Sequence, residues 1–425
     1  MRVRGERLRR PLVAGAIAGL CWVATSAWAG ASLDQAVLQG VLRHPEVQAA
    51  EAEVAMATTE VAMIRNAYLP AVGVSAGTTA PGLGYDVNLS QTVFDWGQTN
   101  SQVDQKRAQL ARQQANLQVV RDDVALEIVE VYLDVASRRA QLSLVDSYLQ
   151  RLEALSSMAQ TRVEGRYSDQ AETGRVALAV ATTTGMKARL MGELADATSH
   201  YALLVGEPSD GLRLPDPPEF LEALRKDGGL DAAIVTAPIY RRARLAVQAA
   251  DAVVREAKAS RFPRLAVEGS LQRREIGGRM VDDSAVGLRL RFNTQQGLSA
   301  LQRPALEEQR CAAIALEAES VARDLKRTVE SLAAQDGALD GRITALSDQA
   351  AQSEAVREVY REQFLVGRRD IQDLVIMEGE HFEAERQVIE LTIDRLRLQY
   401  RAAAQLGLLT PALSGDEMQQ PTEIF

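Results

Sequence analysis

The stretch HPEVQAAEAEVAMATTEVAMIRNAYLP, residues 44–70, decides the fold because its outline occurs twice in the chain. The second occurrence is APIYRRARLAVQAADAVVREAKASRFP, residues 237–263. Each stretch is rich in alanine, and the same spacing of 25 residues separates its two prolines, which are Pro45 and Pro70 in the first. Proline fits the first turn of a helix, and it pushes the residue before it toward extended backbone. Each stretch therefore predicts a helix that ends at its second proline, and the first helical segment is expected over 32–66.

Behind each second proline, apolar and polar residues alternate. Val286, Leu288 and Leu290, for example, are interleaved with Arg289 and Arg291. A period of two predicts strands, and the glycine-containing turns between the runs predict two hairpins. The alternating runs are 72–77, 87–93, 265–272 and 286–292. Such strands fit a membrane wall with lipid on one face and water on the other, and they fit an ordinary half-buried sheet equally well.

Each hairpin is followed by a very long helical stretch. Residues 99–163 contain no glycine or proline, and 305–364 form the corresponding stretch of the second copy. Apolar residues recur in them every seven positions, as in a coiled coil. The two rows are Val103, Leu110, Leu117, Val124 and Val131, and then Leu325, Leu332, Leu339 and Leu346. At 1.5 Å per residue, the first helix would be on the order of 100 Å long. Each long helix is expected to return through a second helix, over 172–205 and 371–406.

The beginning of the chain has the pattern of a secretory signal peptide. Five arginines precede an apolar run at 12–23, and Ala27-Trp28-Ala29 fits a cleavage site. The apolar run is too short to span a membrane comfortably, and Cys21 follows a leucine, so lipidation is not expected. The predicted organisation is a signal peptide at 1–29, a first repeat at 30–206, a linker at 207–236, a second repeat at 237–410 and a C-terminal tail at 411–425.

Composition and charge exclude several classes of protein. The chain of 425 residues has a formal net charge of −9, which becomes −13 without the signal peptide and its five arginines and one glutamate. This acidity argues against nucleic acid as a partner. Cys311 is the one cysteine outside the signal peptide, so no intramolecular disulfide is expected. No apolar run outside the signal peptide approaches the length of a membrane helix, so any crossing of a membrane has to use strands.

Four strands cannot enclose a pore by themselves. The smallest membrane barrels have about eight strands, and open strand edges are not tolerated in hydrocarbon. If the strands span a membrane, two or three chains have to share a barrel of about 8 or 12 strands. The strand count leaves the choice between two and three chains open.

Nine short features follow one another in a distinctive order. They are His44-Pro45, Leu69-Pro70, Phe94-Asp95-Trp96-Gly97, Gly165, Leu204 to Pro208, Ala237-Pro238, Phe262-Pro263, Val366-Gly367 and Leu406-Gly407-Leu408-Leu409. In this ordered set the chain resembles the TolC family of outer-membrane channels. The resemblance implies a mainly α homotrimer with a membrane β-barrel and an internal two-fold repeat. Four strands per protomer would contribute to a shared 12-stranded barrel, long coiled-coil helices would form a periplasmic α-barrel, and the linker would lie in an equatorial region.

The resemblance also implies a location, partners and a function. The protein would lie in the outer membrane of a Gram-negative bacterium, in contact with lipid and with a large periplasmic portion. It would provide a passive, gated duct and bind a periplasmic adaptor (membrane fusion) protein and an inner-membrane transporter.

The particular transport system is a separate question. Val205-Gly206-Glu207-Pro208 and the missing lipidation site look like the type I secretion branch, whose transporter is an ABC transporter. The alternatives are the outer-membrane channel of a proton-driven multidrug efflux pump and, in another class, a soluble periplasmic coiled-coil scaffold.

No enzymatic, cofactor or metal site is expected. His44, His200 and His381 lie on separate predicted elements without the spacing of metal ligands. Gly82-Leu83-Gly84 lacks the third glycine of a phosphate-binding loop.

Two sites are expected where the long helices turn at the periplasmic tip. By resemblance, the adaptor-docking residues are Gly165, Arg166, Tyr167, Gly367, Arg368 and Arg369, and the gate candidates are Asp169, Asp370, Asp373 and Arg369. Both glycines are expected to supply the positive φ of a tight turn, and the simpler alternative is that they are turns and nothing more.

The gate candidates match the family only in part. Asp373 stands at an acidic position of the family, whereas Ile376 and Ala171 stand where an acid would be expected. A ring of acids would attract cations, and Arg369 would pair with Asp169 across the tip.

Five aromatic residues flank the predicted strand ends: Tyr68, Phe94, Trp96, Phe262 and Phe292. They fit an aromatic belt at the periplasmic face of the membrane, and they fit packing between barrel and helices equally well.

Overall fold

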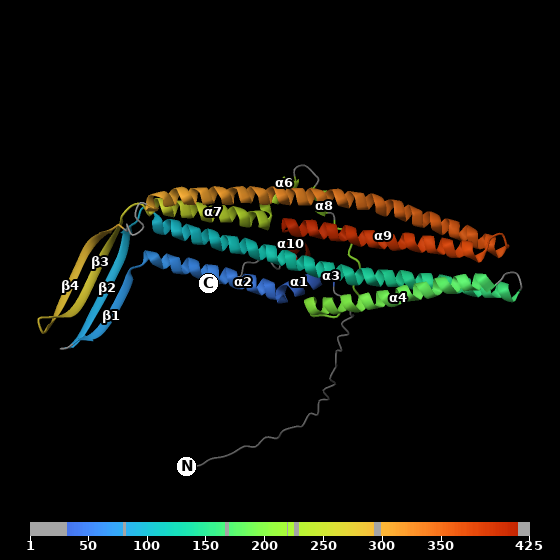
Figure 1. The fold of residues 1–425 in the computed structure, drawn as a ribbon, viewed down its shortest axis with the longest axis horizontal. Helices are drawn as coiled ribbons and strands as arrows, with labels where there is room; N and C mark the ends of the chain where they lie inside the picture. The colour runs from blue at the N-terminus through green and yellow to red at the C-terminus, as the bar shows by residue number, and fades with distance from the viewer. Residues whose placement is uncertain are drawn as a thin grey trace, which may run out of the picture.

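The chain forms one long, narrow molecule with a small sheet at one end and two helical turns at the other (Figure 1). The computed structural model describes residues 32–79, 82–165, 170–218, 220–224, 229–292 and 299–414. The predicted signal peptide and most of the predicted C-terminal tail lie outside the described residues. The predicted fold class, mainly α with four strands, is confirmed.

The first half runs from helix to hairpin to long helix and back. Its elements are α1 (Leu33–Arg43), α2 (Pro45–Arg65), the 3-10 turn η1 (Asn66–Tyr68), β1 (Ala71–Thr79), β2 (Gly82–Phe94), α3 (Gln98–Glu164) and α4 (Gln170–Val205). One expectation was wrong in detail, because the helix expected over 32–66 is broken at His44. His44 has extended backbone, with φ −68° and ψ 129°, as the proline after it requires. Its Nδ1 then accepts a hydrogen bond from the Glu46 amide at 3.3 Å and caps α2.

The second half repeats this order after two short helices, α5 (Phe220–Leu224) and α6 (Gly229–Thr236). Its elements are α7 (Pro238–Ala259), β3 (Arg264–Ile276), β4 (Arg279–Arg291), α8 (Ser299–Leu365) and α9 (Ile371–Leu406), and α10 (Leu409–Ser414) follows. The two long helices, α3 and α8, have 67 residues each, and the two returning helices, α4 and α9, have 36 each. This equality agrees with the predicted internal repeat, while the exact domain boundaries stay predictions.

The four strands form one antiparallel sheet in the order β1-β2-β3-β4, so the β2–β3 pairing joins the two halves of the chain. The register aligns the apolar positions on one face, because Val72 pairs with Leu89, and Val267 pairs with Leu288. This apolar face is exposed in the described chain, with Val286 at 84%. The opposite face is polar and carries an ion pair of 2.8 Å between Arg289 and Glu268.

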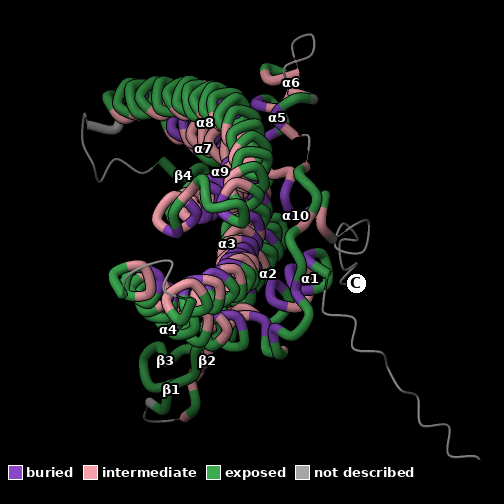
Figure 2. Tube along the Cα trace, turned by 90° about the vertical axis from the view of Figure 1, so that its right-hand side faces the viewer, coloured by how far each residue is buried: buried purple, intermediate pink, exposed green. Residues whose placement is uncertain are grey.

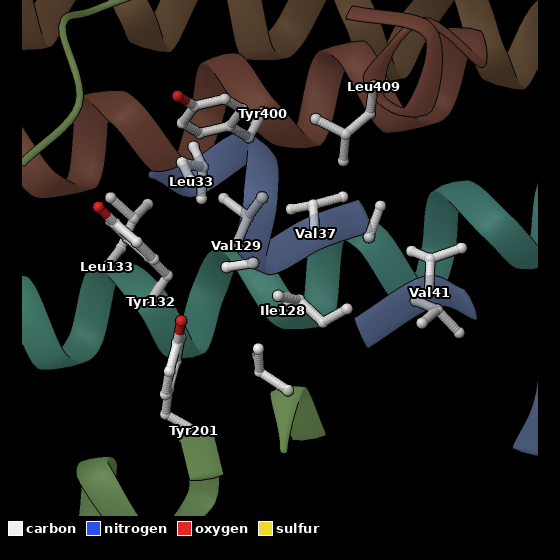
Figure 3. Packing of buried hydrophobic residues seen from close by; sticks show 14 of the residues in the cluster. Leu33, Val37, Val41, Ile128, Val129, Tyr132, Leu133, Tyr201, Tyr400 and Leu409 are labelled. Carbon is white, nitrogen blue, oxygen red and sulfur yellow. The ribbon is translucent and has the colours of Figure 1, made fainter. Parts of the chain in front are cut away.

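The helical part holds its own core where α1 crosses α3. Val37 and Val41 of α1 pack in one cluster with Ile128 of α3, and Tyr201 of α4 closes the cluster from below (Figure 3). In Figure 2 the buried positions gather on α3, α7 and α9, whereas much of α8 is exposed. In the described part of the chain, no helix combines the length and apolar character that crossing a membrane would need.

A buried carboxylate ties α10 to the middle of α3. Asp122 is 2% exposed, and its Oδ1 accepts a hydrogen bond from the Thr410 amide at 2.8 Å. Burial raises the pKa of Asp122 to about 6. Because the folded state favours the protonated acid, this group stabilises the fold most below its ordinary pKa of 3.8, and the contribution is lost as the pH rises to about 6.

We predict that Asp122→Asn removes this pH dependence. The amide keeps an oxygen to accept from Thr410 and carries no charge to bury. Relative to wild type, the variant should gain about 2 kcal/mol in unfolding free energy between pH 4 and pH 7. Thermal unfolding of the detergent-solubilised protein at both pH values measures this gain. Asp196→Asn, at an exposed position of α4, is the control, and an Asp122→Asn effect that is equal at both pH values would contradict the prediction.

Candidate functional site

The two helix–helix turns lie at the same end of the molecule, far from the sheet (Figure 1). One turn joins α3 to α4 after Gly165, and the other joins α8 to α9 around Gly367. The predicted docking and gate residues belong to these turns. Arg166, Tyr167 and Asp169 lie outside the described residues, so their contacts stay predictions.

The α8–α9 turn is a Schellman motif built on glycine. Gly367 has φ +74°, its amide donates to Phe364 O at 3.0 Å, and the Arg368 amide donates to Gln363 O at 2.8 Å. Asp370 then caps α9 by accepting from the Asp373 amide at 3.0 Å. The reversal is therefore fixed by backbone hydrogen bonds at the end of α8 and by a side-chain cap at the start of α9.

Arg369 is the most connected side chain of this turn. Its guanidinium donates to Asp373 Oδ2 at 3.1 Å and to Gln363 Oε1 at 3.2 Å. It also lies 4.1 Å from the centre of the Tyr360 ring. The structure thus joins three of the predicted gate residues, Arg369, Asp370 and Asp373, and it gives Arg369 a partner on its own turn.

The expectation for Gly165 was wrong. Its φ is −73° and its ψ is −3°, which is ordinary helical backbone, and its amide donates to Thr161 O at 3.1 Å. Positive φ is therefore found at Gly367 and not at Gly165, although the helices that lead to the two turns have equal lengths.

The predicted aromatic residues gather at the junction between sheet and helices. The Trp96 ring centre lies 4.9 Å from that of Phe94 and 4.8 Å from that of Phe262. The Trp96 indole donates to Pro263 O at 3.0 Å, which links the end of β2 to the start of β3. Tyr68 donates to Asn100 at 2.5 Å, and Phe292 follows β4. All five residues are about half exposed. Packing at the junction is therefore compatible with a second role of these residues at the membrane interface.

At the same junction, a strained turn directly precedes α3. Trp96 has φ +59°, a rare value for a residue with a side chain, and Gly97 has φ +83°. Asp95 stabilises this turn by accepting from the Gly97 amide at 3.1 Å and the Thr99 amide at 2.7 Å. These bonds hold the pKa of the Asp95 carboxyl below its usual value, against the opposing effect of burial.

One polar cluster was not foreseen. His381 of α9, which the spacing of histidines had marked as isolated, is buried between carboxylates of α8 and α9. Glu378 and Glu385 lie seven residues apart on α9, but this spacing could have indicated the cluster only if the register between α8 and α9 had been known. Among the described residues, no group of histidine, cysteine or acidic side chains is arranged to hold a metal ion.

Comparisons with known proteins agree with this geometry. The sequence model of the family described as "Outer membrane efflux protein" matches residues 39–184, about a third of the chain. No curated protein sequence matches the chain. The family description agrees with the predicted outer-membrane location and the absence of an enzymatic function, and it names efflux and not type I secretion.

Solved structures show the fold over nearly the whole chain. CusC, described in connection with transmembrane channel formation, has a TM-score of 0.76 at 15% identity and covers 88% of this chain and 91% of its own. The outer membrane protein VceC from Vibrio cholerae has a TM-score of 0.75 at 14% identity, covering 88% and 96%. The outer membrane channel MtrE from Neisseria gonorrhoeae has a TM-score of 0.71 at 19% identity, covering 89% and 89%. The chain therefore has the fold of these outer-membrane proteins.

We predict that the two tip glycines differ in their tolerance of a side chain. Gly367→Ala forces a methyl group onto left-handed backbone, which costs about 1–2 kcal/mol, whereas Gly165→Ala places it on ordinary helical backbone. Amide hydrogen exchange at 363–372 should rise roughly 5- to 30-fold in Gly367→Ala. The matched Gly165→Ala variant should leave exchange at 161–165 unchanged or slower, and equal effects at both tips would contradict the assignment.

Proposed function

We propose that this protein is the outer-membrane channel of a tripartite export system, a passive duct that is opened by its partners. The observation that carries the proposal is the exposed apolar face that runs across all four strands at one end of a long helical body. A soluble protein seldom leaves so continuous an apolar surface uncovered. Lipid is the solvent that this face fits, while the polar face fits a water-filled pore.

The barrel is completed by other copies of the chain. Within the described sheet, β1 and β4 each have one neighbour, so each protomer brings two open edges. Open edges in hydrocarbon are prohibitively costly, and pairing β4 of one copy with β1 of the next removes them. Three copies give a 12-stranded barrel in a homotrimer, and the exposed side of α8 becomes the contact between helical portions of neighbouring copies.

The tip receives a periplasmic adaptor protein. Leu365 and Val366 next to the α8–α9 turn are both 71% exposed, although they are large and apolar. Gly367 adds no side chain beside them, so a helical hairpin of the adaptor can approach closely. Gly165, Arg166, Tyr167, Arg368 and Arg369 are the further docking residues in this proposal.

The gate lies at the same tip. Asp370, Asp373 and Arg369 form a bonded group in each protomer, and a trimer brings three such groups around one axis. Asp169 is the fourth candidate, contributed by the other turn. Partner binding at the tip would exchange these bonds for bonds with the adaptor, which separates the helices.

For the cargo, we propose type I protein secretion driven by an ABC transporter. Its support is the segment Val205-Gly206-Glu207-Pro208, which ends the first half and resembles that branch of the family. The second candidate, drug efflux with a proton-driven pump, is favoured by the name of the matched family. Deletion of the gene decides between them: loss of a secreted protein from the medium supports secretion, and a gain in sensitivity to small toxic compounds supports efflux.

We predict that an arginine on the apolar face blocks membrane insertion. Val286→Arg places a charge toward lipid, at a cost of about 2–4 kcal/mol per copy. Ala285→Arg is the matched control, because the adjacent residue points to the polar face. Assembly into the outer membrane should fall for Val286→Arg and persist for Ala285→Arg. In a soluble periplasmic scaffold, both changes would be harmless surface substitutions, and that result would overturn the proposal.

We predict that Arg369→Ala loosens the closed tip. The change removes the bonds to Asp373 and Gln363 and the contact with Tyr360. The purified protein in planar bilayers should open several times more often than wild type. Arg368→Ala is the control at the neighbouring exposed position: its proposed docking role needs the adaptor, which is absent from the bilayer, so this variant should open as often as wild type. Unchanged opening in Arg369→Ala would remove this residue from the gate.

A further inference from the structure

A polar network joins three long helices behind the tip. It consists of Arg151 on α3, Glu354 and Arg357 on α8, and Glu378, His381 and Glu385 on α9. At 1.5 Å per residue along α9, it lies on the order of 20 Å from the α8–α9 turn. α8 and α9 run side by side through this region toward the tip (Figure 1). The network is therefore placed to control how firmly the hairpin is held together.

One nitrogen of the His381 ring faces two carboxylates. His381 is 7% exposed, and its Nε2 lies 3.2 Å from Glu354 Oε2 and 3.3 Å from Glu385 Oε2. Ionised carboxylates can only accept hydrogen bonds. A bare lone pair on Nε2 would be repelled by both, so this nitrogen has to carry a hydrogen.

The other ring nitrogen also faces acceptors. Nδ1 of His381 lies 3.2 Å from Ala350 O and 3.1 Å from Ser353 Oγ. The Ser353 hydroxyl donates its one hydrogen to Ala350 O at 2.8 Å, so its oxygen is left to accept. Nδ1 has to carry a hydrogen as well. Because a neutral imidazole has one hydrogen for two nitrogens, this arrangement is that of the charged imidazolium.

The charges of the network lead to the same protonation state. Arg151 donates to Glu378 at 2.8 Å, and Arg357 contacts Glu378 at 3.1 Å and Glu354 at 2.5 Å. With Glu385, 3.9 Å from Arg151, three carboxylates face two guanidinium groups. A charged His381 brings the sum of these six side chains to zero, whereas a neutral ring leaves one uncompensated negative charge beside the buried His381 and Glu378.

Two further groups lie beside this network. From α3, Tyr148 stacks on Phe382 with ring centres 4.3 Å apart, and burial raises the pKa of its phenol, so it stays uncharged. Arg361 of α8 lines one pocket with Arg151, Arg357 and Glu378, whereas the ion pairs of His381 are with Glu354 and Glu385.

We propose that His381 is a pH-operated latch between α8 and α9. When the ring is charged, its ion pairs with Glu354 and Glu385 hold α8 and α9 together. The ion pair of Arg151 with Glu378 connects α3 to the same network. When the ring loses one proton as the pH rises, its positive charge no longer balances the two carboxylates, one of its nitrogens is left facing acceptors without a hydrogen, and the hairpin loosens. Histidine is the side chain that ordinarily changes charge between pH 5 and 8. The effect on gating rests on the proposed channel function, whereas the latch itself does not.

Amide hydrogen exchange tests the latch without reference to transport. The full-length protein in detergent is compared at pH 5.5 and pH 8, with the intrinsic effect of pH on exchange removed. In wild type, the local opening of 350–357 and 378–385 should increase about tenfold at the higher pH, the size expected for the loss of one hydrogen bond to a charged group. His381→Gln should show the same opening at both pH values. His200→Gln is the matched control, because His200 is on the exposed surface of α4 and should keep the tenfold change.

A second variant covers the case that His381→Gln does not fold. Glu354→Gln keeps the histidine and removes one of its two carboxylates, so the change with pH should shrink to about threefold. A wild-type protein without the tenfold change, or a His381→Gln variant that keeps it, would overturn the latch. If exchange responds as expected while the wild type forms no conducting pore in bilayers, the latch stands and the channel function is overturned. If the protein conducts and exchange does not respond, the channel stands and the latch is overturned.

Discussion

In the proposed membrane location, the structure depends on the need of every backbone amide in hydrocarbon for a hydrogen-bond partner within the protein. Four strands satisfy each other along the inner pairings β1–β2, β2–β3 and β3–β4, and they leave the outer edges of β1 and β4 open. The register puts the apolar residues of all four strands on one face. A single chain therefore leaves two strand edges without partners. The proposed trimer follows because pairing these edges between copies closes the sheet.

The helical body connects the sheet to the distant tip. Trp96, Asp95 and Gly97 fix the angle at which α3 leaves the sheet, and the hydrogen bond from Trp96 to Pro263 couples the two halves at that point. From there α3 and α8 run as helices of 67 residues to the tip. The halves stay alike along this path and differ where they turn, because Gly367 has left-handed backbone and Gly165 does not. The tip is thus where the near-symmetry of the chain ends.

Much of the fold could be predicted from periodicity. The period of two located the strands, and the freedom from glycine and proline located α3, because both patterns are local. The break at His44 was missed although Pro45 was noted, since the effect of proline on the preceding residue was applied only at Pro70. The His381 network could not be predicted, because it depends on the register between α3, α8 and α9, which no local pattern records. The Asp373 bond to Arg369, at a spacing of four residues, was not among the predictions, and the predicted pair of Arg369 with Asp169 stays a prediction because Asp169 lies outside the described residues.

The central claim is that chains close the sheet by pairing β4 of one copy with β1 of the next. Cysteine cross-linking tests it most directly, with Cys311, the free cysteine of the described chain, replaced by alanine. One cysteine is placed at Val74 on β1, and a second is moved stepwise through 282–288 on β4. We expect at least one pair to form disulfides between copies in outer membranes and to give a ladder on a denaturing gel that ends at three chains. A protein that stays monomeric for every pair and leaves the cell with the soluble periplasmic fraction would contradict the account.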